Sequence, residues 1–245
     1  MSQFFALPSD IDAARAIALL RGEEARHLGR VTRVKKGDEV RIFDGGGNRY
    51  LGIAADFSGD TLLLEKLSPL PSCEPKKELT VAQALIKGDR WEWFLEKAVE
   101  LGALRIIPLI TSRTVARPDR EGSGKKVERW RKILLSAAKQ CERGKIPEIT
   151  APLGLAEFLR VLGPAEKSEE RFFCAERAGA RFLSPGAEKN KSLVALGPEG
   201  GWSEEEAASL VKTGFSPVSL GERILRSETA AIAALSVFLA AEHVK

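Results

Sequence analysis

The sequence has few histidines and cysteines and no long apolar run, so it lacks the usual signals of metal sites, disulfide bridges and membrane spans. Among its 245 residues are two histidines and three cysteines. The cysteines are scattered and odd in number, which is typical of a reducing compartment, and there is no Cys-x-x-Cys or histidine pair to bind zinc. No apolar run approaches the roughly 18 residues of a membrane span, and the first residues lack the basic-then-apolar layout of a signal peptide. We therefore expect a cytoplasmic protein with no bound metal and no membrane partner.

What is present suits a globular protein with an uneven surface charge. Hydrophobic residues make up 44% of the chain, and its length fits one large domain or two ordinary ones. The net charge is +4, yet residues 105–145 alone carry twelve Lys and Arg against four Asp and Glu. Such a basic stretch attracts a polyanion, and counterion release makes the binding depend on salt. A solvated helix face is the alternative interpretation.

Two glycine-rich elbows near the carboxyl end are the most informative features. The first reads LGPEGG over residues 196–201, follows a short apolar strand and runs into a helix. Ser203 is a suitable N-cap for that helix, and Glu206 completes a capping box. Strand-to-helix elbows of this kind bind ligands in α/β proteins. Because three glutamates at 204–206 would repel phosphate at the helix start, we expect a ligand without phosphate.

The second elbow, at residues 220–230, reads LGERILRSETA and precedes an alanine-rich helix. The two elbows together resemble the RsmE family, the 16S ribosomal RNA uridine-N3 methyltransferases of the SPOUT class. That family carries motifs close to GPEGG and LGxRILRxETA, in this order. The resemblance implies methyl transfer from S-adenosylmethionine to N3 of a uridine in 16S ribosomal RNA of the small ribosomal subunit. It also implies a homodimer, and the last helix, predicted over residues 228–243 and apolar on nearly all sides, is expected at or beside the interface.

A proline-rich break at residues 68–75 predicts two domains, 1–73 and 74–245. Before the break, strands predicted at 39–43, 50–57 and 61–67 and helices predicted at 11–20 and 23–28 indicate a small β-barrel-like domain, which resembles the family's PUA-like RNA-binding domain. After the break, strands and helices alternate, which predicts an α/β fold with a parallel sheet. The helices include one capped by Asp89 and another over residues 126–142. A C-terminal trefoil knot is implied by the resemblance alone.

The resemblance also indicates which residues form the site. The backbone of both elbows would cradle S-adenosylmethionine. The residues expected to bind it are Leu196, Gly197, Pro198, Glu199, Gly200, Gly201, Leu220, Gly221, Ile224 and Leu225. Loss of the N3 proton leaves negative charge on O2 and O4 of uracil, which Arg226 could stabilise, and Glu199 or Glu228 could accept that proton. In the structural alternative, Glu228 caps its helix and Arg226 pairs with it.

Two basic groups are candidates for contacts with RNA phosphates. They are Arg26, Arg30 and Arg33 in the first domain, and Lys125, Lys126, Arg129 and Arg143 in the second. Arg143 lies in a segment similar to the family's EQxxRxxxP, with Lys139 in place of the leading Glu, and its alternative role is to complement a helix dipole.

Three other interpretations of the whole chain remain open. One is a SPOUT methyltransferase for another RNA or another base or ribose atom. Another is an RNA-binding assembly module without catalysis. The third, a binder of a phosphate-bearing nucleotide, is disfavoured by the acidic helix start.

Overall fold

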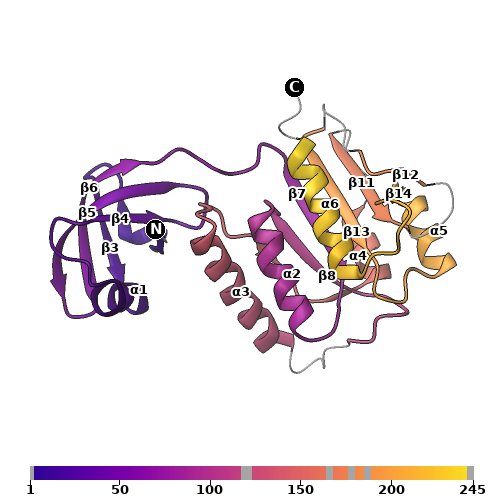
Figure 1. Ribbon diagram of the computed structural model, residues 1–245, viewed down its shortest axis with the longest axis horizontal. Coiled ribbons are helices and arrows are strands. Elements are labelled where there is room, and N and C mark those ends of the chain that lie inside the picture. Colours follow the sequence, from indigo (N-terminus) through magenta and orange to yellow (C-terminus); the bar gives the residue numbers. More distant parts are fainter. Residues whose placement is uncertain (1–2, 117–122, 164–167, 176–179, 185–188, 242–245) are drawn as a thin grey trace. The chain divides into compact units, whose positions relative to one another are not determined.

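The computed structural model describes residues 3–116, 123–163, 168–175, 180–184 and 189–241 (Figure 1). The chain divides into two compact units. The first comprises residues 1–74 together with 135–146, and the second comprises residues 75–134 and 147–245. The helix α3 (Ser123–Gln140) therefore contributes residues to both units.

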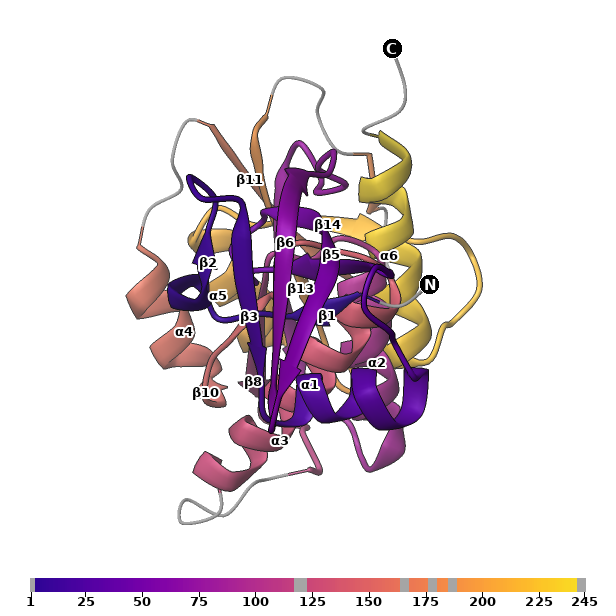
Figure 2. The ribbon, with the colours of Figure 1, turned by 90° about the vertical axis from the view of Figure 1, so that its left-hand side faces the viewer.

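The first unit is built on a six-stranded sheet with the strand order β1-β4-β5-β6-β3-β2, seen face-on in Figure 2. Its antiparallel centre consists of β4 (Glu39–Phe43), β5 (Arg49–Ser58) and β6 (Thr61–Pro69). Asp44 closes the turn between β4 and β5, because its Oδ1 atom accepts hydrogen bonds from three successive backbone amides. The remaining elements are β1 (Phe4–Phe5), β2 (Ile11–Asp12), β3 (Ile17–Arg21), α1 (Glu23–His27) and the single-turn segments η1 (Pro8–Asp10) and η2 (Leu28–Thr32).

The helix predicted at residues 11–20 is wrong. Residues 11–12 and 17–21 form a hairpin of two strands, and β3 pairs antiparallel with β6. Leu20 is fully buried between the strands, and Ala16 turns the chain with a φ of 55°. The alanines favour a helix locally, but pairing with β6 buries this apolar stretch in the sheet, and that tertiary contact overrides the propensity.

The second unit is built on an eight-stranded sheet whose strands are all paired in parallel, as the alternating pattern predicts. The strand order is β10-β8-β7-β13-β11-β14-β12, with β9 beside β8. The strands are β7 (Glu78–Ala84), β8 (Arg105–Ile110), β9 (Glu148–Ile149), β10 (Leu153–Gly154), β11 (Glu169–Cys174), β12 (Arg181–Phe182), β13 (Lys191–Leu196) and β14 (Ser216–Ser219).

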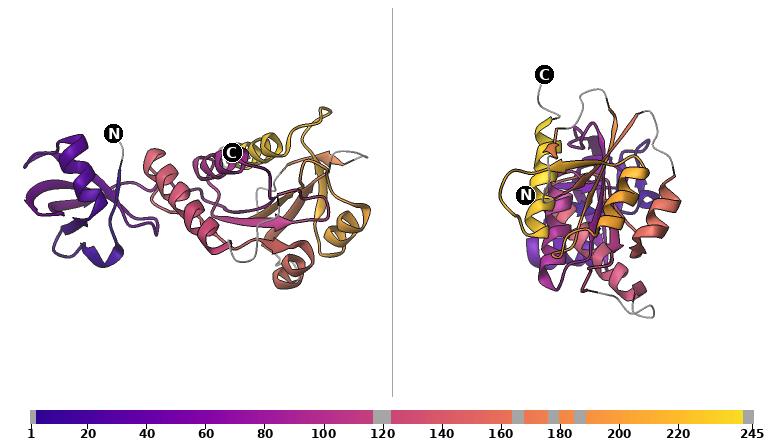
Figure 3. Two further views of the ribbon diagram at one scale, coloured as in Figure 1. Left: turned by 90° about the horizontal axis from the view of Figure 1, so that it is seen from below. Right: turned by 90° about the vertical axis from the view of Figure 1, so that its right-hand side faces the viewer.

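Helices cover both faces of this sheet (Figure 3). On one side lie α2 (Asp89–Glu100) and α6 (Ser227–Ala241), and on the other lie α4 (Leu155–Leu162) and α5 (Glu204–Lys212). Side chains alternate along each strand, so Phe172 of β11 packs against Phe238 of α6, while its neighbour Phe173 belongs to the core under α4 and α5. Burial on both faces explains the consecutive apolar residues in the central strands, such as residues 193–196 of β13.

The start of α5 forms as predicted. The Ser203 hydroxyl accepts a hydrogen bond from the Glu206 amide at 3.2 Å, and the Glu206 carboxylate accepts one from the Ser203 amide at 3.0 Å. The cap predicted at Asp89 is wrong: Gly88, with a φ of 61°, is the N-cap of α2, and Asp89 is the first helical residue. The trefoil knot stays a prediction from the resemblance.

Candidate functional site

Both glycine-rich elbows lie at the same edge of the second unit's sheet. The first connects β13 to α5 and the second connects β14 to α6. Because the strands are parallel, their carboxyl ends meet at one edge, which is where α/β folds bind ligands. Residues of both elbows line a solvent-accessible pocket of about 890 Å³. All ten residues predicted to bind the cofactor line this pocket, as do Arg113, Phe173, Cys174, Ala175 and Trp202, which the sequence did not indicate.

The first elbow needs its glycines for steric reasons. Gly201 has a φ of 67°, which side chains with a Cβ rarely adopt, and its amide donates to the Pro198 carbonyl at 2.9 Å. A Cβ on Gly197 would lie 3.2 Å from the indole nitrogen of Trp202. That nitrogen donates to the Cys174 carbonyl at 3.0 Å, so Trp202 connects the elbow to the end of β11.

A buried hydrogen-bond chain ties the two elbows together. The Ser227 hydroxyl, within the second elbow, donates to the Gly197 carbonyl in the first at 2.6 Å. Gln83 of β7 donates to the same hydroxyl at 2.8 Å. Gln83 and Ser227 are buried polar residues, so the chain fixes the spacing of the elbows from beneath the pocket.

The two candidate proton acceptors lie on either side of an arginine that the sequence did not indicate. Arg90, at the start of α2, has one guanidinium nitrogen 3.7 Å from a Glu199 oxygen and another 3.7 Å from a Glu228 oxygen. Glu199 and Arg226 line the pocket, but Glu228 does not. Glu228 is buried, and its Oε2 atom has no hydrogen-bond partner among the described residues. No motif marks Arg90, because its position depends on how α2 packs on α6.

Cys174 lines the pocket, but its chemistry excludes it as a nucleophile. Burial raises the pKa of its thiol to about 12. Since the thiolate is the reactive form, the side chain is inert at neutral pH. Of the cysteines in the described residues, Cys73 is exposed and Cys141 is half-buried, and all are free thiols.

The exposed residues predicted to contact RNA are divided between the two units. In the first unit, Arg26, Arg30 and Arg33 are exposed on and just after α1, with Arg26 3.7 Å from Asp60. In the second unit, Lys125, Lys126 and Arg129 are exposed on α3. Arg129 also lies 2.6 Å from Glu92.

Arg143 is not available as an RNA contact. Its side chain is 5% exposed and donates two hydrogen bonds, at 2.7 and 3.1 Å, to one carboxylate oxygen of Glu74. We therefore correct the prediction that Arg143 contacts RNA. Its role is structural, because it binds Glu74 inside the first unit.

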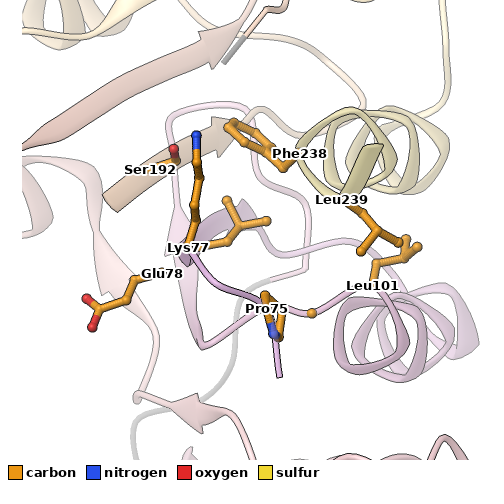
Figure 4. A pocket seen from close by; sticks show the side chains of 9 residues that line it. Pro75, Lys77, Glu78, Leu101, Ser192, Phe238 and Leu239 are labelled. Atoms are coloured by element: carbon orange, nitrogen blue, oxygen red, sulfur yellow. The ribbon is translucent and has the colours of Figure 1, made fainter. Parts of the chain in front are cut away.

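The second unit also has a small cavity of about 10 Å³ at the opposite end of its strands (Figure 4). It is lined by Leu101, Ser192 and Phe238 among others, and the buried Ser192 hydroxyl has no partner among the described residues. The volume suits about one water molecule, so this cavity is too small for a cofactor.

Comparison with known proteins relates the pocket to a family. The family described as "RNA methyltransferase domain" matches residues 73–239, and "RNA methyltransferase PUA domain" matches residues 20–66. The chain is 36% identical over 232 residues to "Ribosomal RNA small subunit methyltransferase E" of Synechocystis, which covers 90% of this chain and 72% of that protein. It is 30% identical over 228 residues to the Bacillus subtilis protein of the same name, covering 89% and 87%.

The fold agrees with the sequence comparison. A crystal structure of ribosomal RNA small subunit methyltransferase E from Neisseria gonorrhoeae, bound to S-adenosyl methionine, superposes with a TM-score of 0.84 at 28% identity and covers 98% of this chain and 97% of that one. Sequence and fold thus match along nearly the whole chain, in both units. The chain belongs to the ribosomal RNA small subunit methyltransferase E family.

Proposed function

We propose that the protein transfers a methyl group from S-adenosylmethionine to N3 of a uridine in 16S ribosomal RNA of the small ribosomal subunit. The observation that supports this most is the pocket that both elbows form at the carboxyl edge of the parallel sheet. The relative from Neisseria gonorrhoeae is bound to S-adenosyl methionine and shares this fold. The relatives from Synechocystis and Bacillus subtilis are named ribosomal RNA small subunit methyltransferases, which supports the substrate class.

The residues of the pocket fit this cofactor. Its volume lies within the roughly 300–1,000 Å³ of small-molecule sites. Its walls combine elbow backbone with the apolar side chains of Phe173, Leu196 and Leu225. α5 begins with the negative charge of three glutamates, of which Glu204 lines the pocket, and the hydrogen bond from the Ser203 hydroxyl lowers the pKa of Glu205. That charge disfavours a phosphate and suits a cationic sulfonium.

The protein's own groups would support the reaction in two ways. The cofactor supplies the methyl group as an electrophile, and the uracil N3 must lose its proton to attack it. Arg226 faces the pocket, where its guanidinium would stabilise the negative charge that grows on O2 and O4. Glu199 also lines the pocket and is the better candidate to accept the N3 proton, because Glu228 is buried and does not line the pocket.

The remaining parts of the proposal concern partners and place. We infer that Arg26, Arg30, Arg33, Lys125, Lys126 and Arg129 contact phosphates of the ribosomal RNA. We also infer a homodimer in the cytoplasm. In α6 the side chains of Ala234 and Leu235 are fully buried within the second unit, but Ile232, Ala233 and Val237 are only partly covered. A second copy packed on this face would cover that apolar surface.

The test is mass spectrometry of 16S ribosomal RNA from cells with and without the gene. The expected result is the loss of one 3-methyluridine, restored by the wild-type gene but not by an Arg226→Met variant. An unchanged 16S pattern together with a lost methyl group elsewhere would indicate another RNA or atom. If calorimetry detects no binding of S-adenosylmethionine, the chain acts as an assembly module.

A further inference from the structure

A turn outside both elbows supports the first elbow from the side. This turn, Thr111–Thr114, directly follows β8. The Thr114 amide donates to the Thr111 carbonyl at 3.2 Å, and the Thr111 amide donates to the Thr114 hydroxyl at 3.0 Å. Both threonines are buried, and their hydroxyls lie 2.9 Å apart. The turn is therefore closed by its own hydrogen bonds, and the side chains at both of its ends are buried.

Arg113 reaches from this turn to the elbow backbone. One of its guanidinium nitrogens donates to the Gly200 carbonyl at 2.8 Å and to the Trp202 carbonyl at 3.2 Å. The approach is close along the whole side chain, since a Cβ built on Gly200 would lie 3.2 Å from the Cβ of Arg113. Hydrogen bonds from a charged donor to backbone carbonyls are stronger than neutral ones, so they restrain the loop although Arg113 is exposed.

A second contact joins the same turn to the helix that follows the elbow. The Ser112 amide donates to one Glu206 oxygen at 2.7 Å, while the other Glu206 oxygen accepts from the Ser203 amide at 3.0 Å. The carboxylate that completes the capping box therefore also binds the turn after β8. The elbow is held at residue 200 and residue 202 by Arg113, and at its exit into α5 through Glu206.

We propose that Arg113 is a positioning residue that holds residues 197–203 in the conformation that binds the cofactor. This inference rests on the proposed function for the identity of the ligand. Glycine loses more conformational freedom on ordering than other residues do, so an elbow with Gly197, Gly200 and Gly201 needs an external restraint to be preformed. Without Arg113, binding would have to order the elbow, and the affinity would fall.

The experiment compares Arg113→Met with Arg105→Met in the full-length protein. Arg105 is an exposed arginine at the first residue of β8, the strand that precedes the turn, and its guanidinium lies 3.7 Å from Glu148. Titration calorimetry with S-adenosylmethionine should show binding weakened at least tenfold for Arg113→Met and unchanged for Arg105→Met. Hydrogen exchange of the protein without cofactor should accelerate in residues 199–203 of Arg113→Met and remain unchanged in β7 and β8.

The outcomes separate the inference from the proposed function. Equal affinity, or unchanged exchange in the elbow, for wild type and Arg113→Met would overturn the role of Arg113. If Arg113→Met does not fold, Arg113→Gln decides: it keeps a polar side chain but removes the charged donor, and we expect weaker cofactor binding and faster exchange in the elbow, whereas wild-type values for both would overturn the role. If the wild type itself does not bind S-adenosylmethionine, the proposed function fails, while faster exchange in the elbow would still support Arg113 as its restraint.

Discussion

The ion pair between Glu74 and Arg143 is expected to stabilise the first unit, and a single substitution tests this. The Arg143 side chain is 5% exposed and that of Glu74 is 16% exposed. One Glu74 oxygen accepts two hydrogen bonds from the guanidinium, and the other accepts the Lys145 amide at 3.0 Å. A Glu74→Ala change removes the acceptor for all three hydrogen bonds and leaves the guanidinium without this carboxylate in a buried position.

The expected cost is about 3 kcal/mol of the first unit's free energy of unfolding. Removing one partner of a buried ion pair typically costs about 3–5 kcal/mol. We take the lower end because water reaches Glu74 and because Arg143 keeps other contacts. Such a change corresponds to roughly two orders of magnitude in the unfolding equilibrium. It should therefore be measurable even if the unit opens only transiently.

The distribution of tryptophan allows the two units to be followed separately. Trp91, Trp93, Trp130 and Trp202 all belong to the second unit. Tryptophan fluorescence during urea unfolding therefore reports the second unit, and hydrogen exchange of peptides from β4 to β6 reports the first. Glu74→Ala should speed exchange in those strands by about two orders of magnitude. Glu65→Ala, an exposed glutamate on β6, is the matched control and should change little.

One result would refute this reasoning. If Glu74→Ala exchanges like the wild type, the pair does not stabilise the unit. If, in addition, Arg143→Met folds normally and loses RNA affinity, then the original expectation of an RNA contact was right and the structural role is wrong.

The other predictions concern the pocket, the basic surface and the dimer. Because burial raises the pKa of Cys174 to about 12, roughly one such thiol in 10³ is ionised at pH 9; iodoacetamide at that pH should label Cys73 first and Cys174 only after unfolding, and equal rates would contradict the pKa. Charge reversal at Lys125, Lys126 and Arg129 should weaken RNA binding and flatten its salt dependence without affecting cofactor affinity, and an unchanged salt slope would mean a solvated helix face. Ala233→Glu on the partly covered face of α6 should yield a monomer in light scattering while the fold is kept, and a stable wild-type monomer would remove the dimer.

Much of the fold could be predicted because its signals are local. The strand at residues 39–43 has the predicted bounds, and the capping box at Ser203 forms as expected. The hairpin at residues 11–21 could not be predicted, because its conformation is set by pairing with β6, far away in the sequence. The short helix α4 was also missed, since eight residues are too few for their pattern to distinguish a helix from a strand.

The candidate site also contains residues that could be predicted from the sequence and residues that could not. The elbow residues could be predicted, since glycine, proline and the capping box mark them within one stretch of chain. Gln83, Arg90 and Arg113 could not, because each acts on the elbows from a different strand or helix. Their contacts exist only once the parallel sheet has brought the carboxyl ends of β7, β8 and β13 together.

The contact between Gly200 and Arg113 changes the interpretation of the first elbow's glycines. From the sequence, a side chain at Gly200 is expected to obstruct the cofactor directly. In the structure, a Cβ at this position would first meet the Cβ of Arg113 at 3.2 Å. A Gly200→Val change would therefore displace Arg113 as well as narrow the pocket. A double variant separates the two causes. If Gly200→Val acts by displacing Arg113, then combining it with Arg113→Met should weaken cofactor binding little more than Gly200→Val alone. Additive losses would instead mean that Gly200 acts directly on the ligand.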